Sequence, residues 1–324
     1  MGLTADAQAM VLLCSHLGLA TGAAPDPLTL REWNPLARQL RNTPLARPGA
    51  LLGLTAAQIQ QALALSEEYA ARLACLLERG GALAIEIERL EGLGIWVCTR
   101  ADAGYPAPLR QRLGESAPPV LFGAGEPALP GQPGVAVVGS RSVNETGQRA
   151  ADLIGGACAQ SGLVLVSGGA RGVDRLAMQA ALEARGCAVG VLADSLEQAI
   201  RVPETRAAIT RGDLALLTPY APNAGFSIGA AMGRNRLIYA LADYAIVVAS
   251  DAGKGGTWAG ATEALKAGWV PVFVLDGPDV PDGNRQLLQK GGQSLPERLL
   301  SPELDLPAWL KEHAAGRAVQ ARLL

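Results

Sequence analysis

Short apolar runs alternate with helix-like stretches in the second half of the chain. The runs are nearly continuous in hydrophobic residues, which is typical of parallel strands buried on both faces. They cover residues 135–138, 163–166, 189–192, 214–217, 244–249 and 270–275. Helical stretches are expected between several of them, at residues 145–160, 174–185 and 259–267. The pattern predicts an α/β fold with a doubly wound, mostly parallel, Rossmann-like sheet and right-handed connections.

The residues before this sheet have different patterns. Residues 1–93 predict a small helical domain, with helices at 5–17 and 55–79 and Thr55 as the N-cap of the second. A helix-hairpin-helix unit near residues 48–55 and a helical domain without a binding role are equally good interpretations. Residues 94–134 are rich in proline and predict an extended linker that adds short strands to the sheet.

The predicted Rossmann-like domain spans residues 135–290. After about residue 281 the chain is polar and has no clear periodicity. Residues 291–324 are therefore predicted to be a short, irregular tail that is too small for a winged helix.

Composition limits the classes of function. The chain has 324 residues, of which 49% are hydrophobic and only 4% aromatic, so the core is expected to be aliphatic. A net charge of −2 and a pI near 5.8 argue against binding nucleic acid through overall charge. Any phosphate binding must therefore come from a local cluster of cations.

Cysteines and the N-terminus point to the cytoplasm. The five cysteines are widely spaced and form no C-x-x-C pair, which argues against disulfides and a zinc site. The first basic residue is Arg31, so the apolar start lacks the basic region of a signal peptide. No stretch approaches the roughly 18 apolar residues that a membrane span needs.

Glycine-rich turns lie where ligands of parallel sheets usually bind, beyond the carboxyl ends of the strands. Backbone amides at such turns, together with arginine or lysine, suit phosphate oxygens. The candidate binding residues are Gly139, Ser140 and Arg141; Ser167, Gly168, Gly169 and Arg171; Arg234, Asn235 and Arg236; and Lys254, Gly255, Gly256 and Thr257. Neither G-x-G-x-x-G nor a Walker A loop is present, which disfavours NAD and a P-loop nucleotide site.

Several side chains near these turns have specific expected roles. Ser140 and Ser142 are expected to cap the following helix, and Thr257 to cap the helix after the last turn. Asp174 is expected to cap a helix or to orient an arginine. Arg234 and Arg236 should point about 200° apart on a helix, so one is expected on the ligand and the other on a carboxylate.

Taken singly, each turn could be an ordinary packing turn, but together they predict a row of anion sites. A phosphodiester backbone or a phosphorylated nucleotide would fit such a row. The two histidines, His16 and His313, lie outside the sheet, and no nucleophile triad is apparent, so no catalytic residue, metal or cofactor is predicted. Phe226 and Trp258 are the plausible platforms for stacking bases, and base-specific recognition is not expected.

The motifs resemble those of the DprA/Smf family of DNA-processing proteins over roughly residues 95–290. The segments that carry the resemblance are YPAPLR (105–110), PVLFGAG (119–125), VAVVGSR (135–141), SGGARGVD (167–174), GRNRLIYALA (233–242) and GGTWAGATEAL (255–265). The resemblance implies a cytoplasmic, homodimeric protein that binds single-stranded DNA and loads the recombinase RecA during natural transformation. It also implies phosphate contacts from Arg141, Ser167, Gly168, Arg234 and Arg236.

The chain departs from the family pattern at a few positions. Met178 replaces a family histidine, Ser250 replaces an acidic residue, and Gly233 stands in the lead-in to the arginine pair. A second resemblance, to the LOG phosphoribohydrolases, rests on the Gly-Gly-Thr turn at 255–257 with Glu263. It keeps open two alternatives, hydrolysis of a nucleoside monophosphate and nucleotide sensing without catalysis.

Overall fold

The computed structural model describes residues 2–19 and 25–320. Within these ranges the chain forms two compact units. The first unit comprises residues 1–105, 113–123 and 219–222, and the second comprises 106–112, 124–218 and 223–324. None of the helices in the described ranges is long and apolar enough to cross a membrane.

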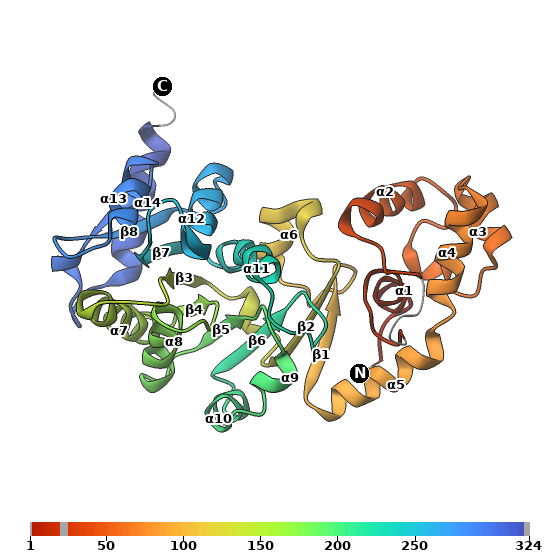
Figure 1. The fold of residues 1–324 in the computed structure, drawn as a ribbon, viewed down its shortest axis with the longest axis horizontal. Coiled ribbons are helices and arrows are strands. Elements are labelled where there is room, and N and C mark those ends of the chain that lie inside the picture. The colour runs from red at the N-terminus through yellow and green to blue at the C-terminus, as the bar shows by residue number, and fades with distance from the viewer. Residues whose placement is uncertain (1, 20–24, 321–324) are drawn as a thin grey trace. The chain divides into compact units, whose positions relative to one another are not determined.

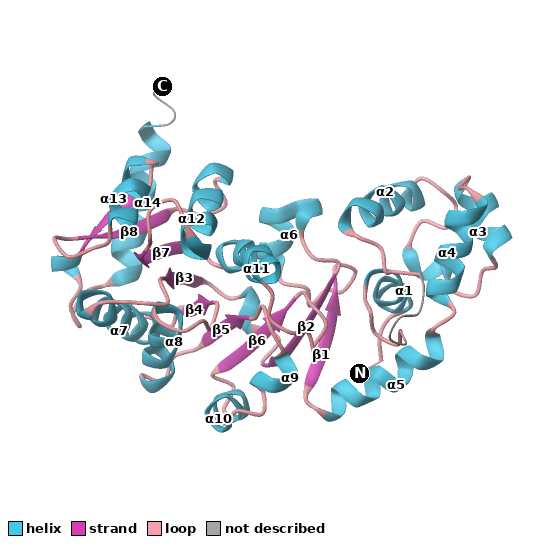
Figure 2. Ribbon diagram, in the orientation of Figure 1, coloured by secondary structure: helices cyan, strands magenta, loops and turns pink. Residues whose placement is uncertain are grey.

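The first unit is mainly helical (Figure 2). Its elements are α1 (Ala5–Cys14), α2 (Leu30–Arg41), the 3-10 helix η1 (Pro48–Leu51), α3 (Ala56–Leu63), α4 (Glu67–Leu77), α5 (Gly80–Gly92), β1 (Ile95–Thr99), η2 (Gly114–Ser116) and most of β2 (Val120–Gly125). Helix α1 is the centre of its core, with six of its residues buried. The Arg79 guanidinium holds the end of α1, because it donates to the carbonyl oxygens of Leu12 and Leu17.

The predicted helix at 55–79 is in fact two helices. Thr55 caps α3 as expected, and its hydroxyl accepts from Gln58 N at 3.3 Å. The helix ends at Ala64, which has a left-handed φ of 47°, and Ser66 then caps α4. The prediction was wrong here because a serine between two apolar stretches can start a helix as well as lie within one.

The second unit contains the parallel sheet. Its strands are β3 (Gly134–Gly139), β4 (Val164–Ser167), β5 (Ala188–Val191), β6 (Leu214–Thr218), β7 (Tyr244–Ala249), β8 (Val272–Asp276) and β9 (Gln293–Pro296). They are ordered β6-β5-β4-β3-β7-β8-β9, and each neighbouring pair is parallel. The six predicted runs match β3 to β8 within two residues at each end.

Helices cover both faces of this sheet (Figure 1). The helices of this unit are α6 (Ala107–Leu113), α7 (Glu145–Gln160), α8 (Val173–Glu183), α9 (Leu196–Ala199), α10 (Pro203–Thr210), α11 (Ile228–Leu241), α12 (Gly255–Ala267), α13 (Asp282–Gln289) and α14 (Leu306–Gln320), with the 3-10 helices η3 (Leu129–Gly131) and η4 (Glu297–Leu299). Helices α7 and α8 pack together on one face, and α11 and α12 pack together on the other. From β3 the chain adds β4 to β6 on one side and β7 to β9 on the other, so the strand order reverses between β3 and β7. Ligands of open parallel sheets bind at such a switch point.

The predicted irregular tail is instead ordered structure. Strand β9 pairs in parallel with β8, and α14 buries Leu306 and Leu310. Trp309 of α14 lies 5.3 Å from Phe273 of β8, ring centre to ring centre. The sequence pattern missed β9 because an edge strand is half exposed, and Leu295 is its one buried apolar residue.

Candidate functional site

Three loops leave the sheet side by side at the switch point. They follow the carboxyl ends of β4, β3 and β7, which are adjacent strands, so they emerge within about 10 Å of one another. The loops touch: Ser140 N donates to Ala249 O at 2.8 Å, and Val173 N donates to Ser140 O at 3.3 Å. Gly172 has a φ of 91° and lies so close to Ser140 O that no side chain would fit there. The tertiary structure therefore brings three of the predicted turns together.

Asp174, in the first turn of α8, is the buried centre of these loops. Its carboxylate accepts from Gly139 N and from Gly168 N, each at 3.2 Å, and also from the amide of Ala170. Burial raises the pKa of Asp174 to about 6, although Arg234 and the three amides favour the charged form. These amides point at the chain's own carboxylate, so the expectation that they all face a ligand was wrong.

Arg234 and Ser167 also lie beneath the surface. Arg234 is only 6% exposed, and its Nη2 donates to Gly168 O at 3.1 Å. Its guanidinium packs against Gly168, where any side chain would overlap it. Arg234 is thus the arginine that lies near a carboxylate, that of Asp174. The Ser167 hydroxyl is fully buried and donates to Val137 O at 2.6 Å, so the expected phosphate contact from this side chain is wrong.

The other charged candidates lie on the loops after β3, β4 and β7 and on α11, and we name Arg141, Arg171, Arg236 and Lys254 the cationic rim. Arg141, Arg171 and Lys254 are exposed, and Arg236 is half-buried with its Nε lacking a hydrogen-bond partner among the described residues. No ion pair within the described ranges involves any of the four. The Arg141 guanidinium lies 5.6 Å from the centre of the Phe226 ring, which is itself exposed. Within the described part of the chain, the rim thus offers cations that form no ion pair with a carboxylate.

The helix caps differ from those expected. Asn144 caps α7 by accepting from Gly147 N at 3.0 Å, whereas Ser140 accepts from Ser142 N within the preceding turn. Helix α12 starts at Gly255 without a side-chain cap, and Thr257 lies inside its first turn. These caps were mispredicted because several Ser, Thr and Asn residues stand close together, and only the path of the loop selects one.

The remaining candidate residues lie within helices or loops, where several of them contact other parts of the protein. Asn235 Nδ2 donates to Gly256 O at 3.0 Å and so ties α11 to the start of α12. Gly169, with a φ of 63°, is half-buried in the loop after β4. Met178 is buried in α8, and Glu263 is exposed on α12. The described residues hold no group of three or more His, Cys, Asp and Glu side chains placed as metal ligands.

Comparison with known sequences gives a consistent result. The family model described as DNA recombination-mediator protein A matches residues 96–299. A putative DNA processing protein DprA from Mycobacterium tuberculosis is 34% identical over 166 residues, 49% of this chain and 41% of that protein. DNA processing protein DprA from Streptococcus pneumoniae is 31% identical over 183 residues, 55% of this chain and 63% of that protein. The matched region thus spans less than two thirds of these relatives.

Solved structures share the fold. The X-ray structure of DprA from Streptococcus pneumoniae superposes with a TM-score of 0.64 at 22% identity, over 96% of this chain and 99% of that chain. DprA from Helicobacter pylori, whose structure was described for its single-stranded DNA binding mode, gives a TM-score of 0.52 at 25% identity. That match covers 68% of this chain and 97% of the Helicobacter pylori chain.

Proposed function

The chain belongs to the DNA recombination-mediator protein A family, and from this premise we propose that it binds single-stranded DNA along the cationic rim. The observation that carries the proposal is the set of rim cations, most of them on loops at the switch point of the sheet, that form no ion pair among the residues the structure describes. Because the whole chain has a net charge of −2, this cluster is a local feature and not a consequence of overall charge. The single-stranded DNA binding mode of the Helicobacter pylori relative supports the choice of ligand.

The layer beneath the rim supports binding by holding the loops in place. Asp174 and Arg234 join the loops after β3 and β4 to α11, so the rim side chains start from a fixed backbone. Arg141 can donate to a phosphate through its planar guanidinium, while the neighbouring Phe226 offers a ring face to a base. Stacking of this kind is tolerant of base sequence, as a backbone-directed site requires.

The Arg141→Ala variant tests the rim directly. We expect it to weaken binding to a thymidine oligonucleotide by about 1 kcal/mol, because one charge-assisted hydrogen bond is lost. Fluorescence anisotropy at constant salt measures the change. The matched control is Arg185→Ala. Arg185 is exposed and precedes β5, so it lies toward the amino-terminal ends of the strands, away from the cationic rim. Equal affinities of wild type and Arg141→Ala would remove Arg141 from the site.

The family also suggests protein partners. We infer that a second copy of the chain and a RecA-type recombinase associate with the DNA-bound form. Light scattering at several concentrations tests for the dimer, and a molar mass near 33 kDa at all of them would contradict it.

For the recombinase, we expect this protein to speed the formation of recombinase filaments on DNA coated with single-strand-binding protein. An unchanged rate would contradict this role.

A further inference from the structure

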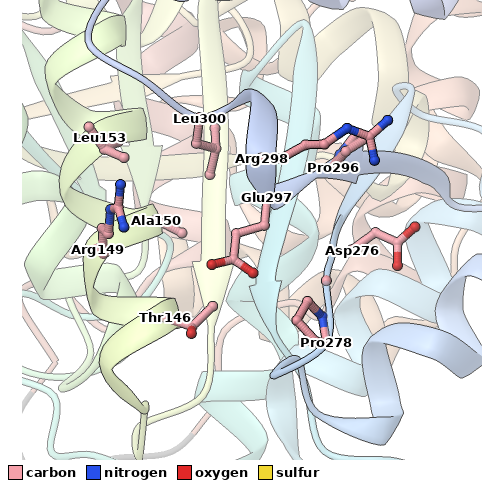
Figure 3. Close-up of a pocket in the computed structure, with 11 residues that line it drawn as sticks. Thr146, Arg149, Ala150, Leu153, Asp276, Pro278, Pro296, Glu297, Arg298 and Leu300 are labelled. Atoms are coloured by element: carbon pink, nitrogen blue, oxygen red, sulfur yellow. The ribbon is translucent and has the colours of Figure 1, made fainter.

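A pocket of about 340 Å³ lies beyond the carboxyl ends of β8 and β9, beside α7 (Figure 3). Its walls come from the first turns of α7, the loop after β8, and the turn that follows β9. The loop after β8 is fastened to α7, because Asn144 Nδ2 donates to Asp279 O at 2.9 Å. Thr146 of the pocket is five residues from Arg141, so at most about 18 Å of chain separates the pocket from the cationic rim.

A half-buried carboxylate, that of Glu297, projects into this pocket. It makes no hydrogen bond or ion pair with the described part of the chain, and in Figure 3 it points toward Thr146. The charged ends of Asp276 and Arg298 point the other way in this view. Glu297 rests against Gly277, where even a methyl group would overlap its Oε2. The absence of a side chain at Gly277 thus leaves room for the Glu297 carboxylate in this position.

The other walls favour a partly apolar ligand. Leu153, Pro278, Pro296 and Leu300 line the pocket, and Thr146 and Arg149 add a hydroxyl and a cation. Pockets for small molecules typically combine such apolar walls with a few polar groups that set orientation. The volume lies at the lower end of the range for such pockets and suits one ring system better than a large ligand.

The chemistry of the carboxylate selects among the bases. An ionised carboxylate only accepts hydrogen bonds, and its two oxygens match two parallel donors. Guanine presents two adjacent donors, N1–H and the N2 amino group, on its Watson–Crick edge. Adenine and cytosine place an acceptor next to their amino group, and thymine places its one N–H between two carbonyl groups. Guanine is therefore the base whose edge fits Glu297.

We propose that this pocket takes one guanine ring and that Glu297 accepts hydrogen bonds from its N1–H and N2 amino group. The proposal rests on the proposed function in one respect, that the ring belongs to the strand bound at the cationic rim. From the sequence, base-specific recognition was not expected, because aromatic residues are scarce. A carboxylate pocket would supply that specificity without an aromatic ring.

The test compares thymidine oligonucleotides with and without one central guanine or adenine. We expect the guanine strand to bind about tenfold more tightly than the other two, the usual scale for a bidentate contact. In Glu297→Gln the side chain offers one donor and one acceptor, so the guanine preference should vanish while thymidine binding persists. Gly277→Ala should have the same effect by displacing the carboxylate. Glu303→Gln, an exposed change just after η4, is the matched control and should keep the preference.

The outcomes separate the two proposals. Equal wild-type affinities for guanine, adenine and thymidine strands would overturn the binding of a strand guanine in this pocket and leave DNA binding intact. Failure to bind any strand would overturn the proposed function. Calorimetry with free GMP and AMP identifies the source of the ring. If GMP binds in a way that depends on Glu297, but DNA strands show no guanine preference, the pocket takes a free nucleotide. An unchanged guanine preference in both Glu297→Gln and Gly277→Ala would also overturn the proposal.

Discussion

Asp174 shows how a single residue can change the meaning of a motif. The glycines around it predict a nest of amides for an external anion, and the structure fills much of that nest with the Asp174 carboxylate. Arg234, 60 residues later in the chain, donates a hydrogen bond to Gly168 O and places a positive charge near the Asp174 carboxylate. The result is a buried polar cluster that shapes the loops, while exposed cations remain for a ligand.

The pKa of Asp174 makes stability depend on pH. Its folded-state value of about 6 lies above the ordinary value of about 3.9 expected in the unfolded chain. The folded protein therefore binds more protons between about pH 4 and pH 6, and the free energy of unfolding falls as pH rises through this window. Asp174 alone should account for a decrease of about 3 kcal/mol, which urea unfolding at several pH values measures.

Asp174→Asn checks the assignment of this effect. The amide oxygen can still accept a hydrogen bond from the loop, but the side chain no longer titrates. The decrease between pH 4 and pH 6 should therefore shrink in the variant. Asp251→Asn is the control, because Asp251 is exposed and its removal should leave the pH profile as in wild type. A profile in Asp174→Asn identical to wild type would contradict the prediction.

Among the helices and strands, one buried polar side chain joins a helix to the ends of two strands that already pair with each other. Asn284 of α13 is fully buried and accepts from Ser250 N at 2.8 Å. Its Nδ2 donates to Val248 O and to Leu275 O, each at 2.9 Å. One amide thus fastens α13 to the ends of both β7 and β8, next to the loop that carries Lys254.

Asn284→Ala should therefore destabilise the protein strongly. The change leaves a buried amide and two buried carbonyl groups without this partner, so we expect a loss of about 3 kcal/mol in the free energy of unfolding. Urea denaturation measures it. Gln286→Ala, an exposed change on the same helix, should stay within about 0.5 kcal/mol of wild type. Equal stability of the two variants would show that the hydrogen bonds of Asn284 contribute little.

At the scale of the whole molecule, charge distribution matters more than net charge. A chain of net charge −2 has no overall attraction for DNA, so the rim has to supply the electrostatic contribution. For single strands, a plot of the logarithm of the binding constant against the logarithm of the salt concentration has a negative slope. Each phosphate that the protein neutralises contributes about −0.7 to that slope. If the four rim cations each engage one phosphate, the slope should be about −3.

A salt series from 50 to 200 mM measures this slope by fluorescence anisotropy. The Arg141→Ala slope should be shallower by about 0.7, because one phosphate contact is removed. A slope near zero for wild type would contradict phosphate-directed binding even if DNA binds. This readout is independent of the base preference that tests the pocket at Glu297.

The sequence and the structure agree best where local patterns decide. The apolar runs predicted β3 to β8, and the glycine turns with Arg141 and Arg171 were placed correctly at the strand ends. The predictions failed at Thr257 and at β9, where the outcome depends on the loop path or on a neighbouring strand. Glu297 escaped notice because it stands in a segment without periodicity.

Local sequence patterns were enough to predict the α/β class, strands β3 to β8 and the motifs that mark the family, because hydrophobic periodicity and turn residues act over a few neighbours. Long-range packing sets the directions of the side chains, so that Asp174, Ser167 and Arg234 are buried while Arg141, Arg171 and Lys254 are exposed. The direction of such a side chain depends on segments that are distant in sequence, as with Gly168 and Arg234, and no local pattern records that contact.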